Sequence, residues 1–141
     1  MSKEDQMAQS IVDQMYANDD FSKWLGIEFI EVKAGTCTIK MKVRKEMTNG
    51  FDIAHGGISY SFADSCFAFA SNSRGRIAVS IETGISHTAP IFSNDVITAV
   101  ATEENLSKSL GVYTIKVTNQ NAKTVALFKG TVFRKKENWD I

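Results

Sequence analysis

The chain has 141 residues, of which 43% are hydrophobic and 23% charged, and its 16 basic and 16 acidic side chains cancel. That length suits one domain with a sizeable core, and that composition is typical of a globular protein. The balanced charge provides no general attraction for nucleic acid or acidic membranes, and no apolar run reaches the length of a membrane span, about 18 residues. We therefore expect a single domain that binds neither nucleic acid nor membrane.

The cysteine content and the first residues indicate where the protein works. Cys37 and Cys66 are too few for a disulfide framework or a zinc site, and they fit a reducing compartment. The opening MSKEDQMAQS is polar and lacks the apolar core and cleavage site of a signal peptide. We expect a cytoplasmic protein.

Hydrophobic periodicity predicts two helices and six strands. A helix is expected over 3–17, with Met7, Ile11 and Met15 along one side, and Asp20 is expected to cap a short turn that ends near Leu25. The long central helix is expected over 56–72. The strands are expected over 27–33, 36–44, 77–85, 96–103, 113–118 and 125–133.

The order of these elements predicts an α+β fold. The last four strands have no helix between them, so they should pair antiparallel. We expect an antiparallel sheet of five to six strands wrapped around the long central helix. Residues 1–141 should form one domain, with an N-terminal helical segment over 1–25 and a loosely held polar tail over 134–141. The central helix is apolar on every side, so a second copy of the protein should cover its remaining face.

The stretch from Asn49 to Asn72, NGFDIAHGGISYSFADSCFAFASN, contains the candidate chemistry. At Gly56-Gly57 the helix begins, and its unpaired N–H groups can hold a carbonyl oxygen as it becomes an oxyanion. Asp64 is the one charged residue of the helix, and burying an unpaired charge costs free energy of folding. The plainer interpretations are a glycine pair that only permits a turn, and an Asp64 bonded to a nearby loop.

Together these two features indicate a hydrolase that acts on a carbonyl. Asp64 lies two turns past Gly57, about 10 Å along the helix, which is far for a single carbonyl to span. We therefore infer that Gly56 of one subunit and Asp64 of its partner meet across a dimer interface. No G-x-S-x-G, H-E-x-x-H, paired cysteines or glycine-rich phosphate loop is present, so neither a serine elbow nor a metal site is expected. His87 is interpreted as a surface or strand-end histidine, with a pocket residue as the alternative.

The same stretch resembles the signature of hot-dog-fold acyl-CoA thioesterases, specifically the phenylacetyl-CoA thioesterase type. The similarity extends to LGIEFIEVKAGTCTIKMKV and to the strands from NDVITAVATEE through VALFKGTVFRK, whereas SHTAPIFSND departs from the family pattern. The residues at matching places are Asn49, His55, Gly56, Gly57, Ala63, Asp64, Ala70, Asn72 and Ser73.

The resemblance implies a hot-dog fold and an active site at a dimer interface, in pairs that often assemble into tetramers. Gly56 would supply the oxyanion N–H, and Asp64 of the other subunit would act as base or nucleophile. Ser65 would help to place the water, while Asn49 and His55 would shape the pocket. No metal or prosthetic group is implied, because coenzyme A is part of the substrate.

Substrate-binding residues are predicted as well. Coenzyme A carries several phosphates, for which we expect basic partners, although each such residue is also explained as an ordinary solvated charge. The predicted phosphate contacts are Arg74, Arg76 and Lys108. The predicted pocket residues are Gly57, Phe51 and Tyr60.

The predicted function is hydrolysis of an acyl-CoA to the free acid and CoA. The acyl group is expected to be aryl-acetyl, such as phenylacetyl or hydroxyphenylacetyl from phenylacetate catabolism, or medium-chain. The alternative is a sensor that binds acyl-CoA without cleaving it. A dehydratase would need a histidine deeper in the central helix, and none is present there.

Overall fold

The computed structural model describes residues 1–141 and contains three α-helices, one short 3-10 helix and one sheet. The helices are α1 (Lys3–Ala17), α2 (Asp20–Leu25), η1 (Lys45–Met47) and α3 (Gly56–Asn72). The strands are β1 (Glu28–Lys33), β2 (Thr36–Lys42), β3 (Arg76–His87), β4 (Val96–Leu106), β5 (Leu110–Thr118) and β6 (Thr124–Asn138). None of the helices is both long and apolar enough to cross a membrane.

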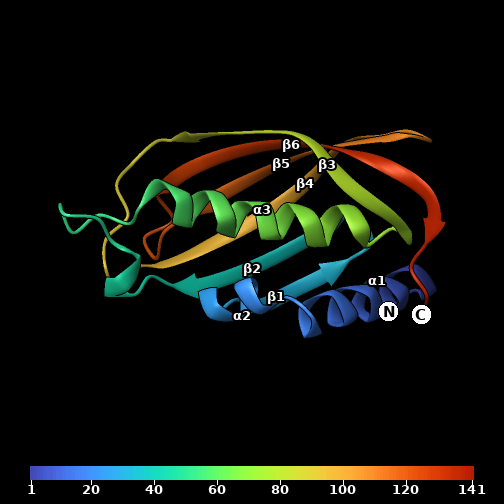
Figure 1. Ribbon diagram of the computed structural model, residues 1–141, viewed down its shortest axis with the longest axis horizontal. Helices are drawn as coiled ribbons and strands as arrows, with labels where there is room; N and C mark the ends of the chain where they lie inside the picture. Colours follow the sequence, from blue (N-terminus) through green and yellow to red (C-terminus); the bar gives the residue numbers. More distant parts are fainter.

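The six strands form one antiparallel sheet in the order β1-β2-β4-β5-β6-β3. Figure 1 shows this sheet curling around α3, which lies along its inner face, while α1 and α2 lie beside β1. The prediction of a five- to six-stranded sheet wrapped around a long helix is confirmed, with six strands. Two strands are left at the edges, and β3 is the longer of them.

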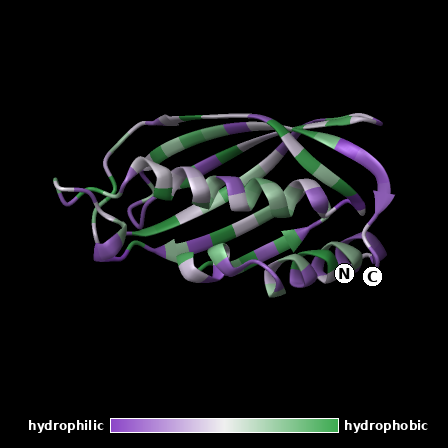
Figure 2. Cartoon of the chain, in the orientation of Figure 1, coloured by the Kyte–Doolittle hydropathy of each residue, from purple (hydrophilic) through white to green (hydrophobic).

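The core forms between the sheet and α3. Hydrophobic and hydrophilic residues alternate along the strands (Figure 2), so one face of each strand points toward the helix. Phe67 of α3 packs on Gly130 of β6, where any side chain would collide, since a Cβ would lie 2.6 Å from the phenyl ring. Its ring also meets Tyr113 and Phe128 at centroid distances of 6.1 and 5.5 Å. These contacts hold the helix in a fixed position over the sheet.

Both cysteines are fully buried in this core, one on β2 and one on α3. The Cys66 thiol donates to the carbonyl oxygen of Cys37 at 3.4 Å. Burial raises the pKa of Cys66 well above its ordinary value. Both behave as small core residues.

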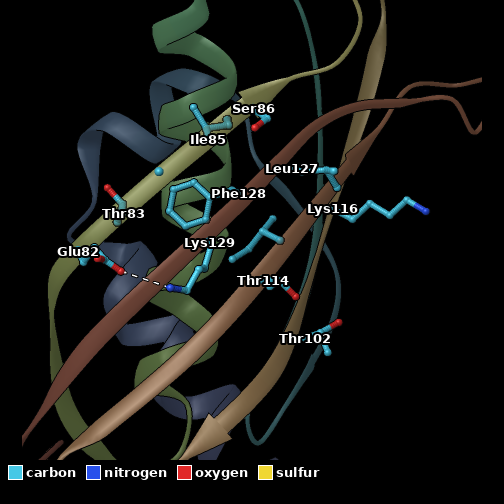
Figure 3. A pocket seen from close by; sticks show the side chains of 12 residues that line it. Glu82, Thr83, Ile85, Ser86, Thr102, Thr114, Lys116, Leu127, Phe128 and Lys129 are labelled. Carbon is cyan, nitrogen blue, oxygen red and sulfur yellow. Dashed lines mark hydrogen bonds and ion pairs between the residues drawn. The ribbon is translucent and has the colours of Figure 1, made fainter.

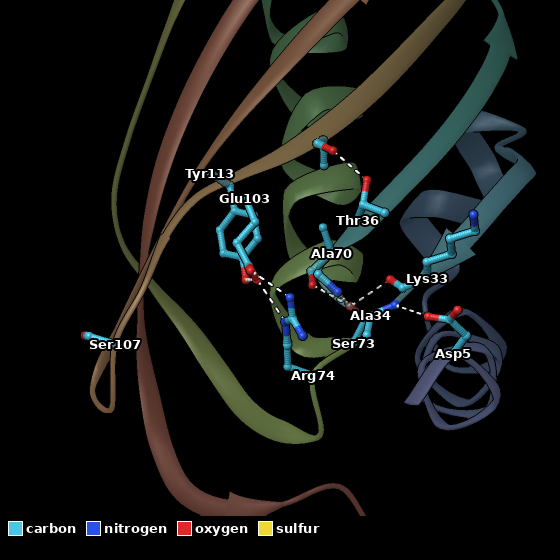
Figure 4. Close-up of polar contacts among 12 residues, drawn as sticks. Asp5, Lys33, Ala34, Thr36, Ala70, Ser73, Arg74, Glu103, Ser107 and Tyr113 are labelled. Atoms are coloured by element: carbon cyan, nitrogen blue, oxygen red, sulfur yellow. Dashed lines mark hydrogen bonds and ion pairs between the residues drawn. The ribbon is translucent and has the colours of Figure 1, made fainter. Parts of the chain in front are cut away.

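A polar cluster fastens the C-terminal end of α3 (Figure 4). Ser73 Oγ accepts from the Gly35 N–H at 2.8 Å and donates to the Ala70 carbonyl at 2.7 Å, which ties the β1–β2 turn to the helix. The next residue, Arg74, makes two contacts with the Glu103 carboxylate, at 3.1 and 2.8 Å. Glu103 also accepts from the Tyr113 hydroxyl at 2.8 Å.

Two expectations about local structure are wrong. The residue that caps α2 is Asp19, whose carboxylate accepts from the Ser22 N–H at 2.9 Å, and Asp20 is already the first helical residue. The tail over 134–141 is not loose, because β6 continues to Asn138 and pairs with the start of β3. Trp139 then donates through Nε1 to the Asn72 side chain at 3.0 Å. Backbone pairing holds this segment although its side chains are mostly charged.

Candidate active site

The loop before α3 is held by its own polar groups. The Asn49 side-chain oxygen accepts from the N–H groups of Phe51 and Ile53, at 2.9 and 3.3 Å. At the end of the loop, the His55 N–H donates to the Met47 carbonyl at 2.8 Å. Asn49 thus stabilises the loop through these hydrogen bonds, and the loop places His55 at the start of the helix.

His55 caps α3 and leaves one backbone donor free. Its Nδ1 accepts from the Gly57 N–H at 3.2 Å, so in the neutral ring the proton is on Nε2. The Gly56 N–H has no acceptor in the chain. As the first residue of the helix, Gly56 directs this N–H outward from the positive end of the helix dipole, where an anion is stabilised. The free donor suited to an oxyanion is therefore that of Gly56.

Gly56 borders a cavity of about 420 Å³ at the helix start. The cavity is lined by Ile53, Ala54, Gly56, Ser59, His87, Thr88, Ala89, Pro90 and Ile91. His87, the last residue of β3, lies so close to Gly56 that a methyl group there would come within 3.3 Å of its Nε2. The other ring nitrogen, Nδ1, is 3.2 Å from the Ser59 hydroxyl.

His87 is a strand-end histidine, as interpreted from the sequence, and it also lines a cavity, which was the alternative. A usable signal was present in the strand pattern. Thr83, Ile85 and His87 follow at two-residue spacing, and they pair with Gly130, Phe128 and Ala126, which face the helix. That spacing places the imidazole on the inner face of the sheet.

A second groove, of about 390 Å³, lies on the other side of the helix start. It includes His55, Gly57 and Ser61, and its outer wall is the stacked aromatic pair Phe21 and Trp24 of α2, with ring centroids 6.0 Å apart. Gly56 and Gly57 thus border different spaces, the cavity lined by His87 and this second groove. Gly57 borders this groove with its N–H already bonded to His55.

Within one chain α3 keeps one face uncovered, and this is the face that a second copy of the protein was expected to cover. Gly57, Ser61, Asp64 and Ala68, spaced along one face, form a strip that is open to solvent or only partly covered. The Asp64 carboxylate bonds to no group of the chain, and partial desolvation raises its pKa above the ordinary value.

Three further predicted residues surround this strip. Ser65 points toward α2, where its hydroxyl lies 2.9 Å from that of Ser22. Tyr60 points toward β3, with its hydroxyl 2.7 Å from the Thr83 hydroxyl. Phe51, at the loop tip, is 84% exposed. Within one chain, none of them lies against the free Gly56 N–H.

The predicted phosphate-binding residues lie at the opposite end of α3. Arg74 is paired with Glu103 as described above. Arg76 donates to three backbone carbonyls, those of Lys135, Lys108 and Arg134, at 2.6–3.0 Å. The Lys108 side chain is exposed in the turn between β4 and β5. Both arginines are engaged in holding the chain together, and the structure does not bring these three residues to Gly56.

A third groove, of about 790 Å³ and larger than the two at the helix start, lies open on the outer face of the sheet (Figure 3). Its walls come from β3, β4, β5 and β6, and Glu82 and Lys129 form an ion pair there at 3.4 Å. It contains none of the predicted site residues and no free backbone donor at a helix start. Size alone does not make it the active site, and the smaller cavity at Gly56 has the suitable groups.

Comparisons with known proteins identify the family of the chain. Residues 51–126 match the family model of the Thioesterase superfamily. A putative esterase of Archaeoglobus fulgidus is 38% identical over 138 residues, 98% of this chain and 90% of that protein. The acyl-coenzyme A thioesterase PaaI of Escherichia coli K12 is 42% identical over 120 residues, 85% of this chain and 86% of that protein.

A solved structure supports the same conclusion. The E. coli PaaI protein from the phenylacetic acid degradation operon matches with a TM-score of 0.93 and 39% identity, covering 95% of this chain and 97% of that one. A likeness this close extends to nearly every element described above. The chain belongs to the thioesterase superfamily and is a thioester hydrolase with the hot-dog fold that its sequence predicted.

Proposed function

We propose that the protein is an acyl-CoA thioesterase whose active site is shared between two subunits. The observation that supports this most directly is the pair of unsatisfied groups on α3, the Gly56 N–H beside a cavity and the unbonded Asp64 carboxylate on the open strip. Within one chain they are eight residues apart, about 12 Å along the helix. A partner whose open strip packs against this one would bring its Asp64 toward Gly56.

The proposed chemistry needs little else. A thioester carbonyl has weak resonance stabilisation and a good leaving group. The Gly56 N–H would hold the carbonyl oxygen as it gains negative charge, a contact worth about 3 kcal/mol per donor. The partner's Asp64 would act as base toward water or attack the carbonyl carbon itself. Ser65 would help to position the water, while Asn49 and His55 keep the loop and the helix start in place. No metal or further cofactor is proposed.

The free edge of the sheet supports the proposed dimer. β3 pairs with β6 on one side only, so its other side presents unpaired backbone groups along 12 residues. At the bulge of this strand, Ile81 is 59% exposed. Edge strands of this length are normally paired with another strand or covered by a helix or loop. Pairing of two β3 strands would bury the edge, and pairs would assemble further into tetramers.

For the substrate we propose an aryl-acetyl-CoA, such as phenylacetyl-CoA or hydroxyphenylacetyl-CoA, with medium-chain acyl-CoA as the other class. The relative from the phenylacetic acid degradation operon supports the aryl-acetyl choice and a role in phenylacetate catabolism. Gly57, Phe51 and Tyr60 remain the proposed pocket residues. Arg74, Arg76 and Lys108 remain the proposed contacts of the CoA phosphates, and Lys108 is the one whose charged group is free. We place the reaction in the cytoplasm.

The direct test is hydrolysis of a panel of acyl-CoA esters, followed by titration of the released thiol. We expect fastest release from an aryl-acetyl-CoA, with acetyl-CoA much slower. Calorimetric binding of the same esters, measured alongside, separates the two functions. Tight binding without thiol release from any ester would reject the thioesterase and favour the sensor.

A further inference from the structure

The two histidines of the chain lie on either side of the start of α3, and the Nδ1 of each takes part in a hydrogen bond. His55 accepts through Nδ1, as described above. The Ser59 hydroxyl lies 3.2 Å from the Gly56 carbonyl oxygen, to which it can donate, and 3.2 Å from Nδ1 of His87. When the hydroxyl donates to the carbonyl, Nδ1 of His87 is the donor to the hydroxyl. In that arrangement the Nε2 of neutral His87 carries a lone pair, and this nitrogen lies against Gly56.

The position of the free backbone N–H indicates on which side of the helix start the thioester carbonyl would bind. The Gly57 N–H, which borders the aromatic groove, is already bonded to His55. The Gly56 N–H is free and borders the cavity that His87 lines. A carbonyl oxygen held by Gly56 therefore places its carbon in the His87 cavity. At that position a single water molecule could bridge the carbon and Nε2.

His87 is the one titratable side chain among the residues that line this cavity. Its walls are otherwise hydroxyl, glycine and apolar side chains. The Asp64 of the same chain lies about 12 Å farther along the helix. A proton released by water in this cavity thus has one side-chain acceptor from the same chain.

We propose that His87 is a catalytic residue, the base that activates water in the second half of the hydrolysis. This inference depends on the proposed function and selects one of the two roles left open for Asp64. In the first step the partner's Asp64 carboxylate attacks the thioester carbon, a C–O bond forms, and the C–S bond breaks with its electron pair on sulfur. CoA leaves as a thiolate.

In the second step water attacks the resulting anhydride at the acyl carbon. One water proton passes to His87 Nε2, and the new C–O bond yields the carboxylic acid. The anhydride C–O bond breaks with its pair on the Asp64 oxygen, which restores the carboxylate. The His87 imidazolium then gives its proton to the CoA thiolate or to solvent.

The test is pre-steady-state thiol release by the full-length His87→Gln variant, with the acyl-CoA that the unmodified protein cleaves fastest. Gln fills a similar volume and accepts a hydrogen bond but does not take up a proton. We expect a burst of one thiol per active site, then turnover slowed by about 100-fold or more, the usual contribution of a general base. With His87→Ala, added imidazole should accelerate the slow phase.

Matched variants identify each step. Asp64→Asn should abolish the burst itself, whereas Ser86→Ala, on the outer face of the same strand, should leave burst and turnover unchanged. Undiminished turnover in His87→Gln, equal slowing of burst and turnover, or an absence of imidazole rescue would each overturn the role of His87. Failure of the proposed function is distinct, since the unmodified protein would then release no thiol.

Discussion

Asp64 combines exposure with an unsatisfied charge. Its neighbours on the strip are glycine, serine and alanine, and the carboxylate is partly desolvated yet bonded to no group of the chain. Sequence reasoning identified the residue because a charge stands out in an apolar helix. It also predicted that one face of this helix is uncovered within a single chain, although not which residues form that face. For His87 it preferred a surface or strand-end position over a pocket position, because the proximity of His87 to Gly56 joins residues that are far apart in the sequence.

Replacement of Asp64 by Asn should separate chemistry from stability. We expect turnover to fall by roughly 100-fold or more, because the amide is neither base nor nucleophile. Since the pKa of Asp64 is raised in the fold, its ionised form opposes folding above the unfolded-state pKa. Asp64→Asn should therefore unfold at an equal or slightly higher temperature at pH 7, and this difference should vanish near pH 3. Calorimetry at both pH values, with kinetics at pH 7, measures both effects. Full activity would refute the assigned role.

Replacement of Gly56 by Ala should reduce activity more than stability. The position has a helical conformation without positive φ, so the backbone tolerates a side chain. The added methyl would meet His87 Nε2 at 3.3 Å and reduce the space for the thioester carbonyl. We expect a loss of kcat of at least about tenfold with a midpoint of unfolding within a few degrees. A variant that simply unfolds would mean that Gly56 serves only the turn.

At the scale of elements, α1 and α3 begin and end at the predicted residues, because cap and stop residues are local in sequence. Gly75, for example, has φ +112°, the conformation that glycine favours after a helix. The end of β6 could not be predicted in this way. Its residues are charged on both faces, so no alternation marks it, and the pairing with Arg76 of β3 spans about 60 residues.

The cluster at the end of α3 makes a testable contribution to stability. Burial would raise the pKa of Glu103, but bonds from Arg74 and Tyr113 outweigh it and hold this pKa below its ordinary value. Ionised Glu103 therefore stabilises the fold above the unfolded-state pKa, about 4.3, and this stabilisation is lost as the pH falls through the lowered folded-state value. Glu103→Gln should cost about 1–3 kcal/mol at pH 7.

Urea unfolding at several pH values checks this prediction. The difference in unfolding free energy between Glu103→Gln and the unmodified protein should narrow as the pH falls toward 3, because protonation progressively removes the charge of Glu103. Lys129→Gln is a suitable control, since its pair with Glu82 is exposed and contributes little. A gap that is the same at pH 7 and pH 3 would contradict the electrostatic explanation.

At the scale of the whole molecule, a site divided between subunits makes activity depend on association. Ile81→Lys places a charge on the free edge of β3, where the proposed partner strand would pair. We expect light scattering to show a smaller assembly for Ile81→Lys than for the unmodified protein. On dilution, the variant should lose specific activity at a higher protein concentration than the unmodified protein does. Lys123→Gln, in the β5–β6 turn, is the matched surface control. A monomer that retains full specific activity would exclude the shared site.

The burial of Cys37 and Cys66 has a practical consequence for all of these measurements. A colorimetric disulfide reagent needs a reachable thiolate, and neither sulfur is accessible while the core is intact. The folded enzyme should thus react very little with the reagent. The absorbance change can therefore be attributed to released CoA from the first turnover onward. The two protein thiols, one equivalent each, would react only when the core unfolds. The same assay would therefore also detect denaturation.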